Sequence, residues 1–249
     1  MKKLTAKLAS FGTGALLVLS VWQIAHMVLD VNVLPSPLAV FRSVPGLAGR
    51  DMLAHASHSF FRVGMGLFFS MLIGLVLGIA AAGKGALSKV LTPFIYFTYP
   101  MPKVALLPAV MLLFGLTNLS KIIMITLIVV FPIIVVVRDS VKEIPRQTYN
   151  TLICYGASRP QVFWYVTLPW AVSGILSTAR ISLGTAVSIL FFVEAYGSRY
   201  GMGFFILDAW MRLNYIQMYA GIVVLSIFGF ILFIAIDLAE SIAMKWKKG

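Results

Sequence analysis

Six long apolar stretches run through this 249-residue chain, and they restrict its fold more than any other feature. Each is near the length of about 20 residues that a helix needs to cross a hydrocarbon layer. Backbone polar groups find no water inside a bilayer, so a crossing segment must form a helix or a closed barrel. None of the stretches alternates as barrel strands do. The sequence therefore predicts an all-α integral membrane protein with about six transmembrane helices, at residues 11–29, 60–82, 91–116, 122–137, 172–193 and 218–238.

The composition excludes a soluble globular domain. Hydrophobic residues make up 60% of the chain and charged residues 11%, whereas soluble domains carry about 45–50% and about 25%. We expect one transmembrane domain over residues 1–249. The first stretch follows Lys2, Lys3 and Lys7 and could be a cleavable signal peptide, but no small-x-small cleavage site follows it, which favours a retained helix. The single cysteine excludes a disulfide framework and a Cys-based zinc site.

The basic residues predict the orientation. Cytoplasmic loops of membrane proteins carry an excess of Lys and Arg. With the N-terminus inside, twelve Lys and Arg residues face the cytoplasm and five face outward, so both termini are expected in the cytoplasm and nucleic acid is not an expected partner. The inner residues are Lys2, Lys3, Lys7, Lys84, Lys89, Arg138, Lys142, Arg146, Arg159, Lys245, Lys247 and Lys248, and the outer ones are Arg42, Arg50, Lys121, Arg199 and Arg212.

No motif for catalysis emerges from the residues. The segment from Gly78 to Gly85 nearly matches a phosphate-binding loop, but the Ser or Thr that would hold magnesium is missing and an apolar helix precedes it, so we interpret it as a helix end. His55 and His58 could share a helix face as metal ligands, yet no third ligand clusters with them. A membrane-embedded enzyme would need a nucleophile or metal constellation that the sequence does not offer.

The inner loop, residues 138–170, carries the most specific motif. Gly156 is followed by nine residues, then Val166, one residue, and Leu168-Pro169. This spacing resembles the cytoplasmic EAA loop of ABC-importer permeases. A helical stretch over 147–155 and a second one before Pro169 are expected to project as a helix pair that contacts a partner. The residues that the resemblance assigns to ATPase coupling are Asn150, Thr151, Leu152, Gly156, Ala157, Ser158, Arg159, Val166, Leu168 and Pro169.

Segments outside the loop are also similar to this family, and most closely to its nitrate/sulfonate/taurine-type subgroup. They include Leu34-Pro35-Ser36-Pro37, Pro102-Lys103, Phe114-Gly115 and Ile206-Leu207-Asp208. The resemblance implies a type I ABC-importer permease in the cell inner membrane. It also implies a second permease copy, two ATPase subunits that bind ATP and Mg, an extracytoplasmic solute-binding protein and surrounding lipid. This chain itself would bind no cofactor.

Two features refine the coupling prediction. Gly156 can adopt positive φ, so a sharp reversal would let a short helix fit a partner groove, and Pro169 would fix the return into the next helix. The family's Glu-Ala-Ala is Asn150-Thr151-Leu152 here, so an amide replaces the acid. We hypothesise that the partner groove lacks the basic residue that usually meets this acid. Arg146 and Arg159 remain available for acidic partners.

The translocation pathway is predicted from prolines and charges inside the apolar stretches. Pro102 and Pro108 free backbone carbonyls in the third stretch, which makes it a pathway wall or a kinked packing helix. Charges at membrane depth are costly, so Arg180 is expected to face the bundle or to reach the inner surface. Glu194 precedes a Gly-rich segment, 197–203, interpreted as a re-entrant turn or gate lip at the outer mouth. The candidate pathway residues are Pro102, Lys103, Pro108, Arg180, Glu194 and Gly197.

The substrate stays open at this point. The subgroup carries sulfonates, nitrate and related small anions, and other members of the family carry organic molecules such as thiamine-precursor pyrimidines. A secondary transporter driven by an ion gradient is the alternative from another mechanism. It would need carboxylates near the middle of the membrane, but Glu194 and Asp237 lie near helix ends.

Overall fold

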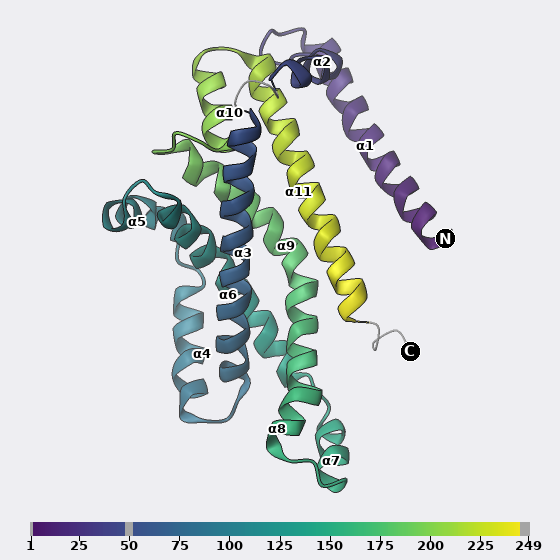
Figure 1. Ribbon diagram of the computed structural model, residues 1–249, viewed down its shortest axis with the longest axis vertical. Coiled ribbons are helices and arrows are strands. Elements are labelled where there is room, and N and C mark those ends of the chain that lie inside the picture. The colour runs from purple at the N-terminus through teal and green to yellow at the C-terminus, as the bar shows by residue number, and fades with distance from the viewer. Residues whose placement is uncertain (1, 48–51, 245–249) are drawn as a thin grey trace.

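A computed structural model describes residues 2–47 and 52–244, and every regular element in those residues is a helix. The long helices form a bundle, and two short helices project from one of its ends (Figure 1). In chain order the elements are α1 (Lys2–Leu29), α2 (Pro37–Leu47), α3 (Leu53–Ala82), α4 (Ala86–Thr98), η2 (Lys103–Leu106), α5 (Leu107–Phe114), α6 (Asn118–Lys142), α7 (Arg146–Cys154), α8 (Arg159–Val162), η3 (Phe163–Thr167), α9 (Leu168–Ala195), α10 (Met202–Met211) and α11 (Tyr215–Ala243).

The membrane architecture predicted from hydropathy is confirmed. Five helices are long and apolar enough to cross a bilayer, and a bent helix pair provides a sixth span if it is taken as one. The helices α6, α9 and α11 extend beyond the predicted stretches at both ends, and α3 begins earlier than predicted but ends at the same residue, Ala82. Of the basic residues used to predict the orientation, Arg50, Lys245, Lys247 and Lys248 lie outside the described residues.

The third predicted crossing, 91–116, is not one helix. It consists of α4 and of a second part formed by η2 and α5, and the two parts meet at 90°. Pro100 and Pro102 lie in the break, and neither can donate the backbone hydrogen bond that would continue α4. Pro108 instead occupies the first turn of α5, where a missing N–H is tolerated.

Small residues spaced four apart on α3 bring it very close to α6. A Cβ built on any of three glycines of α3 would lie 2.4–2.5 Å from a side chain of α6. Because glycine has no side chain, side chains of α6 can pack directly against the backbone of α3, as is common between helices in membranes. Because the contacts follow the same order along both helices, α3 and α6 run in the same direction. The pairs are Gly66 with Ile125, Gly74 with Ile133, and Gly78 with Val137.

The close approach predicts opposite effects for two Gly→Ala substitutions on α3. A methyl group at Gly74 would lie 2.4 Å from Ile133, whereas one at Gly64 would meet nothing within 4 Å. We expect Gly74→Ala to lower the free energy of unfolding by about 1–3 kcal/mol through overpacking. Gly64→Ala, the matched control, should be neutral or stabilising because alanine favours helices. Thermal unfolding in detergent measures both, and equal stability of the two variants would contradict the prediction.

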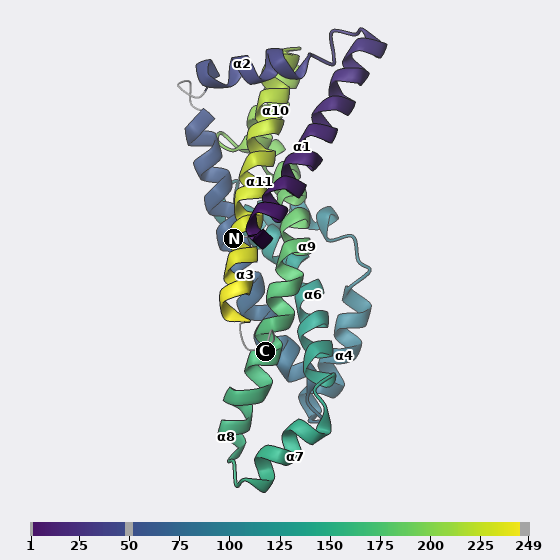
Figure 2. The same ribbon diagram turned by 90° about the vertical axis from the view of Figure 1, so that its right-hand side faces the viewer.

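The two ends of the bundle differ. The helices α7 and α8 project from one end, and α2 and α10 cover the other (Figure 1, Figure 2). Both chain termini lie at the ends of α1 and α11 that point away from α2 and α10. The termini are thus on the side of α7 and α8, which the charge distribution assigns to the cytoplasm.

The inner loop is shorter than the predicted range 138–170. The helix α6 continues to Lys142, and α8, η3 and α9 form one helical run, Arg159–Ala195. Pro169 therefore lies inside a continuous helix, and the expected return at this residue is wrong. A proline within a helix leaves the carbonyl four residues earlier without its donor, and the π-helical turn η3 accommodates this change immediately before Pro169.

Candidate functional site

The projecting segment 146–162, which we call the elbow, comprises α7, a tight turn and α8. Gly156 has a φ of +79°, a left-handed conformation that glycine adopts without steric cost. Its N–H donates to Ile153 O at 2.9 Å, and the N–H of Ala157 donates to Leu152 O at 3.0 Å. These two bonds form a Schellman motif, which ends a helix and reverses the chain. The reversal predicted at Gly156 is confirmed.

Local hydrogen bonds fix the second half of the elbow. The Ser158 N–H and the Ser158 hydroxyl both donate to Gln161 Oε1, at 2.7 and 2.9 Å, which caps the start of α8. The hydroxyls of Tyr149 and Thr167 lie 3.4 Å apart and connect α7 to the base of the following helix. No residue of α7 or α8 is buried. The elbow therefore owes its shape to its own bonds and presents most of its surface outward.

The outer surface of the elbow carries large apolar and basic side chains. Tyr155 is 87% exposed and Ile153 is 59% exposed. Arg146 and Arg159 are also exposed. Exposed apolar groups bordered by charges are typical of surfaces that bind another protein. The arrangement is suited to docking another protein.

The predicted coupling residues fall into two groups. The first group lies on the elbow itself and comprises Asn150, Thr151, Leu152, Gly156, Ala157, Ser158 and Arg159. The second group lies in the helical run that returns to the membrane and comprises Val166, Leu168 and Pro169. Val166 is 4% exposed, so this group packs against the bundle rather than belonging to the outward surface.

A buried polar cluster lies at the opposite end of the bundle. Glu194, at the end of α9, is fully buried, and its carboxylate accepts a hydrogen bond from Arg62 Nη1 of α3 at 2.7 Å. Ser59 Oγ and the Gly203 N–H also donate to this carboxylate, at 2.8 and 3.0 Å. A buried carboxylate is stable only when it is paired and hydrogen-bonded, and both conditions hold here.

The remaining contacts of Arg62 extend the cluster to α6 and to the start of α10. Its Nε and Nη2 donate to Asn118 Oδ1 at 2.9 and 2.7 Å, and its Nη1 donates to Tyr200 O at 2.7 Å. His55 Nδ1 accepts from the Gly201 N–H at 3.0 Å. The described residues hold no group of three or more potential metal ligands. The cluster therefore joins α3, α6, α9 and α10 through hydrogen bonds of side chains to one another and to the backbone.

Sequence reasoning named Glu194 but missed its partners. Arg62 was placed only within a helix, and Ser59, Asn118 and His55 were given no role in this cluster. The signal that could have found the pair was Arg62, the lone arginine in the apolar stretch 60–82, because such a charge needs a buried acid.

The predicted gate segment 197–203 is a turn followed by α10. Gly197 has a φ of +65°, and a Cβ there would lie 2.5 Å from Leu116.

Lys103 stabilises the break in the third crossing. Its Nζ donates to Thr98 O and Tyr99 O at 2.8 and 2.9 Å and lies 4.4 Å from the centre of the Phe131 ring. The carbonyls are those that the end of α4 leaves without helical donors. Pro102 precedes Lys103 in the break, and Pro108 follows in α5, so the three predicted pathway residues of this stretch lie close together in the chain.

Arg180 pairs with two acids of the last helix. Its Nη1 lies 2.9 Å from Asp237 Oδ1 and its Nη2 lies 2.5 Å from Glu240 Oε2. The Arg180 side chain is 32% exposed, so it faces α11 rather than the interior of the bundle. The structure thus separates Arg180 from Glu194 and Gly197, which lie at the outer end.

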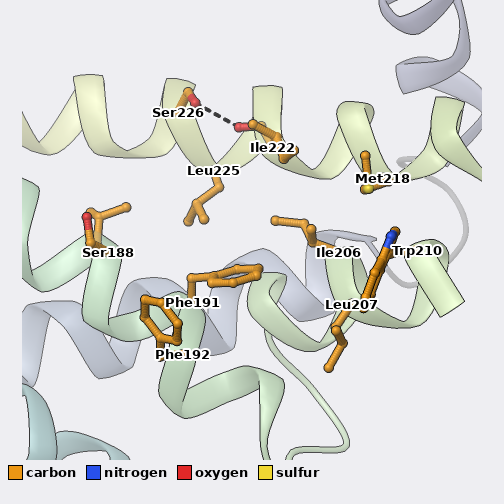
Figure 3. A pocket seen from close by; sticks show the side chains of 11 residues that line it. Ser188, Phe191, Phe192, Ile206, Leu207, Trp210, Met218, Ile222, Leu225 and Ser226 are labelled. Atoms are coloured by element: carbon orange, nitrogen blue, oxygen red, sulfur yellow. Dashed lines mark hydrogen bonds between the residues drawn. The ribbon is translucent and has the colours of Figure 1, made fainter. Parts of the chain in front are cut away.

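An apolar pocket of about 730 Å³ lies between α9, α10 and α11 (Figure 3). Phe191, Ile206, Trp210 and Leu225 point into it, and none of its lining residues is charged. The Ser226 hydroxyl donates to Ile222 O of its own helix at 2.8 Å. The pocket contains none of the predicted pathway residues and offers no partner for an ionic solute.

Comparisons with known proteins agree with this geometry. The family model of the binding-protein-dependent transport system inner membrane component matches residues 74–242. The taurine transport system permease protein TauC of Escherichia coli (strain K12) is 32% identical over 230 residues, which cover 90% of this chain and 84% of TauC. The formylaminopyrimidine transport permease protein ThiX of Halalkalibacterium halodurans is 26% identical, over 94% of both chains.

The fold is also found among solved structures. A chain of the MetNI methionine ABC transporter, in an inward facing conformation, superposes with a TM-score of 0.65 and 22% identity. The match covers 77% of this chain and 95% of that chain. At this identity the likeness concerns the fold alone.

Proposed function

Because the chain belongs to the family of binding-protein-dependent transport system inner membrane components, we propose that it imports a small sulfonate, nitrate or related anion. As a member of this family it is the permease of an ABC importer in the inner membrane. It is a non-catalytic transport subunit, and ATP hydrolysis belongs to a separate ATPase subunit. Members of this family depend on an ATPase, so the alternative of a transporter driven by an ion gradient does not apply to this chain.

The relatives support a small anion as substrate. The names of similar proteins refer to taurine, to aliphatic sulfonates and to bicarbonate. The alternative is a heterocyclic organic molecule, since other relatives are named for formylaminopyrimidine and riboflavin. The identity to TauC, 32%, exceeds the 26% to ThiX, and this difference favours a sulfonate.

We propose that the elbow couples the ATPase to the permease. It would bind the ATPase subunit and pass the movement of the ATPases to the bundle. The observation behind this step is that a rigid turn at Gly156 projects exposed apolar and basic side chains beyond the bundle on the predicted cytoplasmic side. The assembly would contain two copies of this chain, two ATPases and one binding protein.

Reconstituted vesicles test this function. Vesicles that contain the chain, its ATPase and its binding protein should accumulate radiolabelled taurine only when ATP is supplied to the ATPase side. Omission of the ATPase should abolish uptake, since ATP hydrolysis belongs to that separate subunit. Uptake that continues without the ATPase would overturn the assignment, and uptake of a pyrimidine in place of taurine would favour the alternative substrate.

Substitutions on the elbow test the docking surface separately. We expect the variant Ile153→Ser with Tyr155→Ala to retain less than a tenth of the wild-type affinity for the ATPase, because a few large central side chains carry most of the energy of an interface. Pull-down of the ATPase measures the loss. Phe97→Ala is the control, since Phe97 is 83% exposed but lies on α4. Equal recovery of the ATPase by both variants would exclude this surface.

A further inference from the structure

A polar cavity of about 660 Å³ lies beside the buried cluster at the outer end of the bundle. It is open on one side and is lined by the start of α6, by α3 and by the turn that precedes α10. The volume of this cavity is within the range of about 300–1,000 Å³ that is typical of small-molecule binding sites. The lining side chains that can carry charge or donate hydrogen bonds are His58, Arg62, Thr117, Asn118, Lys121, Ser198, Arg199 and Tyr200.

Lys121 reaches this cavity as a buried cation. The residue is 1% exposed, and its Nζ contacts only backbone carbonyls: Leu116 O at 3.3 Å, Gly197 O at 3.4 Å and Thr117 O at 3.5 Å. No carboxylate of the described residues lies within 4.0 Å of this Nζ. Long bonds to neutral acceptors are weak compensation for a buried ammonium group, which needs a negative partner.

Ser198 provides a second unsatisfied donor in the same cavity. The residue is 8% exposed, and its Oγ has no hydrogen-bond partner within the described part of the chain. Almost all buried polar groups in proteins are hydrogen-bonded, so an exception indicates a missing ligand or water. Lys121 and Ser198 both line this cavity, so a buried cation and a buried hydroxyl lie beside one space.

The charge balance of the lining residues is positive. Glu194 neutralises Arg62 at 2.7 Å and lies behind it in the buried cluster. Lys121 and Arg199 have no such partner among the described residues, and Arg199 is exposed at the rim. The cavity therefore attracts anions and repels cations, in contrast to the uncharged pocket between α9, α10 and α11.

We propose that this cavity binds a small oxyanion, with the anionic oxygens on Lys121 Nζ and on Ser198 Oγ. Arg199 would draw the anion to the rim, where the field of an exposed cation acts. The proposal rests on the proposed function, because it gives the imported anion a binding site within this chain at the outer mouth. Glu194 attracts the Lys121 ammonium group without contacting it, and a bound anion would supply the direct contact that no carboxylate of the described residues makes.

Direct binding of methanesulfonate tests the site. Radiolabelled methanesulfonate is equilibrated with the complex of this chain and its ATPase in nanodiscs, without the binding protein. The wild-type complex should show saturable binding. We expect Lys121→Met to weaken it at least tenfold and Ser198→Ala to weaken it about threefold to tenfold, as the loss of an ordinary hydrogen bond does. Arg42→Gln, which removes an exposed outer cation away from the cavity, should bind as the wild type does.

The outcomes separate the site from the transport function. The site is wrong if the wild-type complex binds no methanesulfonate, or if both cavity variants bind it as tightly as the wild type. Should Lys121→Met fail to assemble, Ser198→Ala decides, because it removes one oxygen and adds no bulk. ATP-driven uptake of methanesulfonate in the presence of the binding protein is measured in parallel. Uptake that is unaffected in the variants overturns the site alone, whereas Lys121-dependent binding without any uptake overturns the proposed function alone.

Discussion

Arg62→Met is expected to lower the free energy of unfolding by about 3–5 kcal/mol, because it leaves the Glu194 carboxylate buried without its cation. Methionine fills much of the space of the arginine side chain but makes none of its bonds to Glu194, Asn118 and Tyr200. For a domain of this size the loss corresponds to a fall in Tm of about 6–20 °C. Circular dichroism of the purified chain in detergent during heating measures the change.

The double variant Arg62→Met with Glu194→Met tests whether the charge itself is responsible. With both charges removed, we expect most of the stability to return, since apolar residues can replace a buried ion pair at little cost. Arg212→Met is the control, because Arg212 forms its ion pair with Asp208 at an exposed site, where such pairs contribute about 0–1 kcal/mol. An unchanged Tm for Arg62→Met would show that the pair is not needed for the fold.

Gly156→Val is expected to lower ATP-driven uptake at least tenfold while the chain still reaches the membrane. The elbow turn requires a φ of +79°, and a β-branched residue in the left-handed region carries a strain of about 1–3 kcal/mol. A Cβ at this position meets nothing within 4 Å, so the backbone conformation alone causes the effect. Vesicle uptake and pull-down of the ATPase measure the loss of coupling.

Two further substitutions isolate the conformational cause at Gly156. Asparagine tolerates the left-handed region, so Gly156→Asn should keep most of the uptake. Gly85 lies in an equally open position but has a φ of −78°, and Gly85→Val should leave coupling unchanged. If all three variants transported equally well, the shape of the elbow would not matter for transport.

The features that local chemistry determines were predictable from the sequence. The long apolar runs predicted α1, α3, α6, α9 and α11, and a single glycine after a short helical stretch predicted the turn of the elbow. Prolines predicted disturbance in the third crossing. The angle of 90° between α4 and α5 was not predictable, because it depends on how each half packs against the neighbouring helices.

The outer polar cluster could not be derived from one sequence. Arg62 and Glu194 are 132 residues apart, and nothing local to either one identifies the other. Lys121 was assigned to an outer loop by its neighbours, yet it lies inside α6 and is buried by the turn before α10. The helix α10, at Met202–Met211, was not predicted, and the predicted turn 197–203 overlaps only its first two residues. Long-range contacts decide all three features.

The helical run Arg159–Ala195 has a mechanical consequence. At 1.5 Å per residue it is a strut of roughly 55 Å, with α8 of the elbow at its base and Glu194 near its tip. Tilting such a strut by a few degrees displaces the tip by several ångströms, and Ser198 would move with it relative to Lys121 on α6. A movement of the elbow would therefore widen or narrow the space between Lys121 and Ser198 at the opposite end of the bundle.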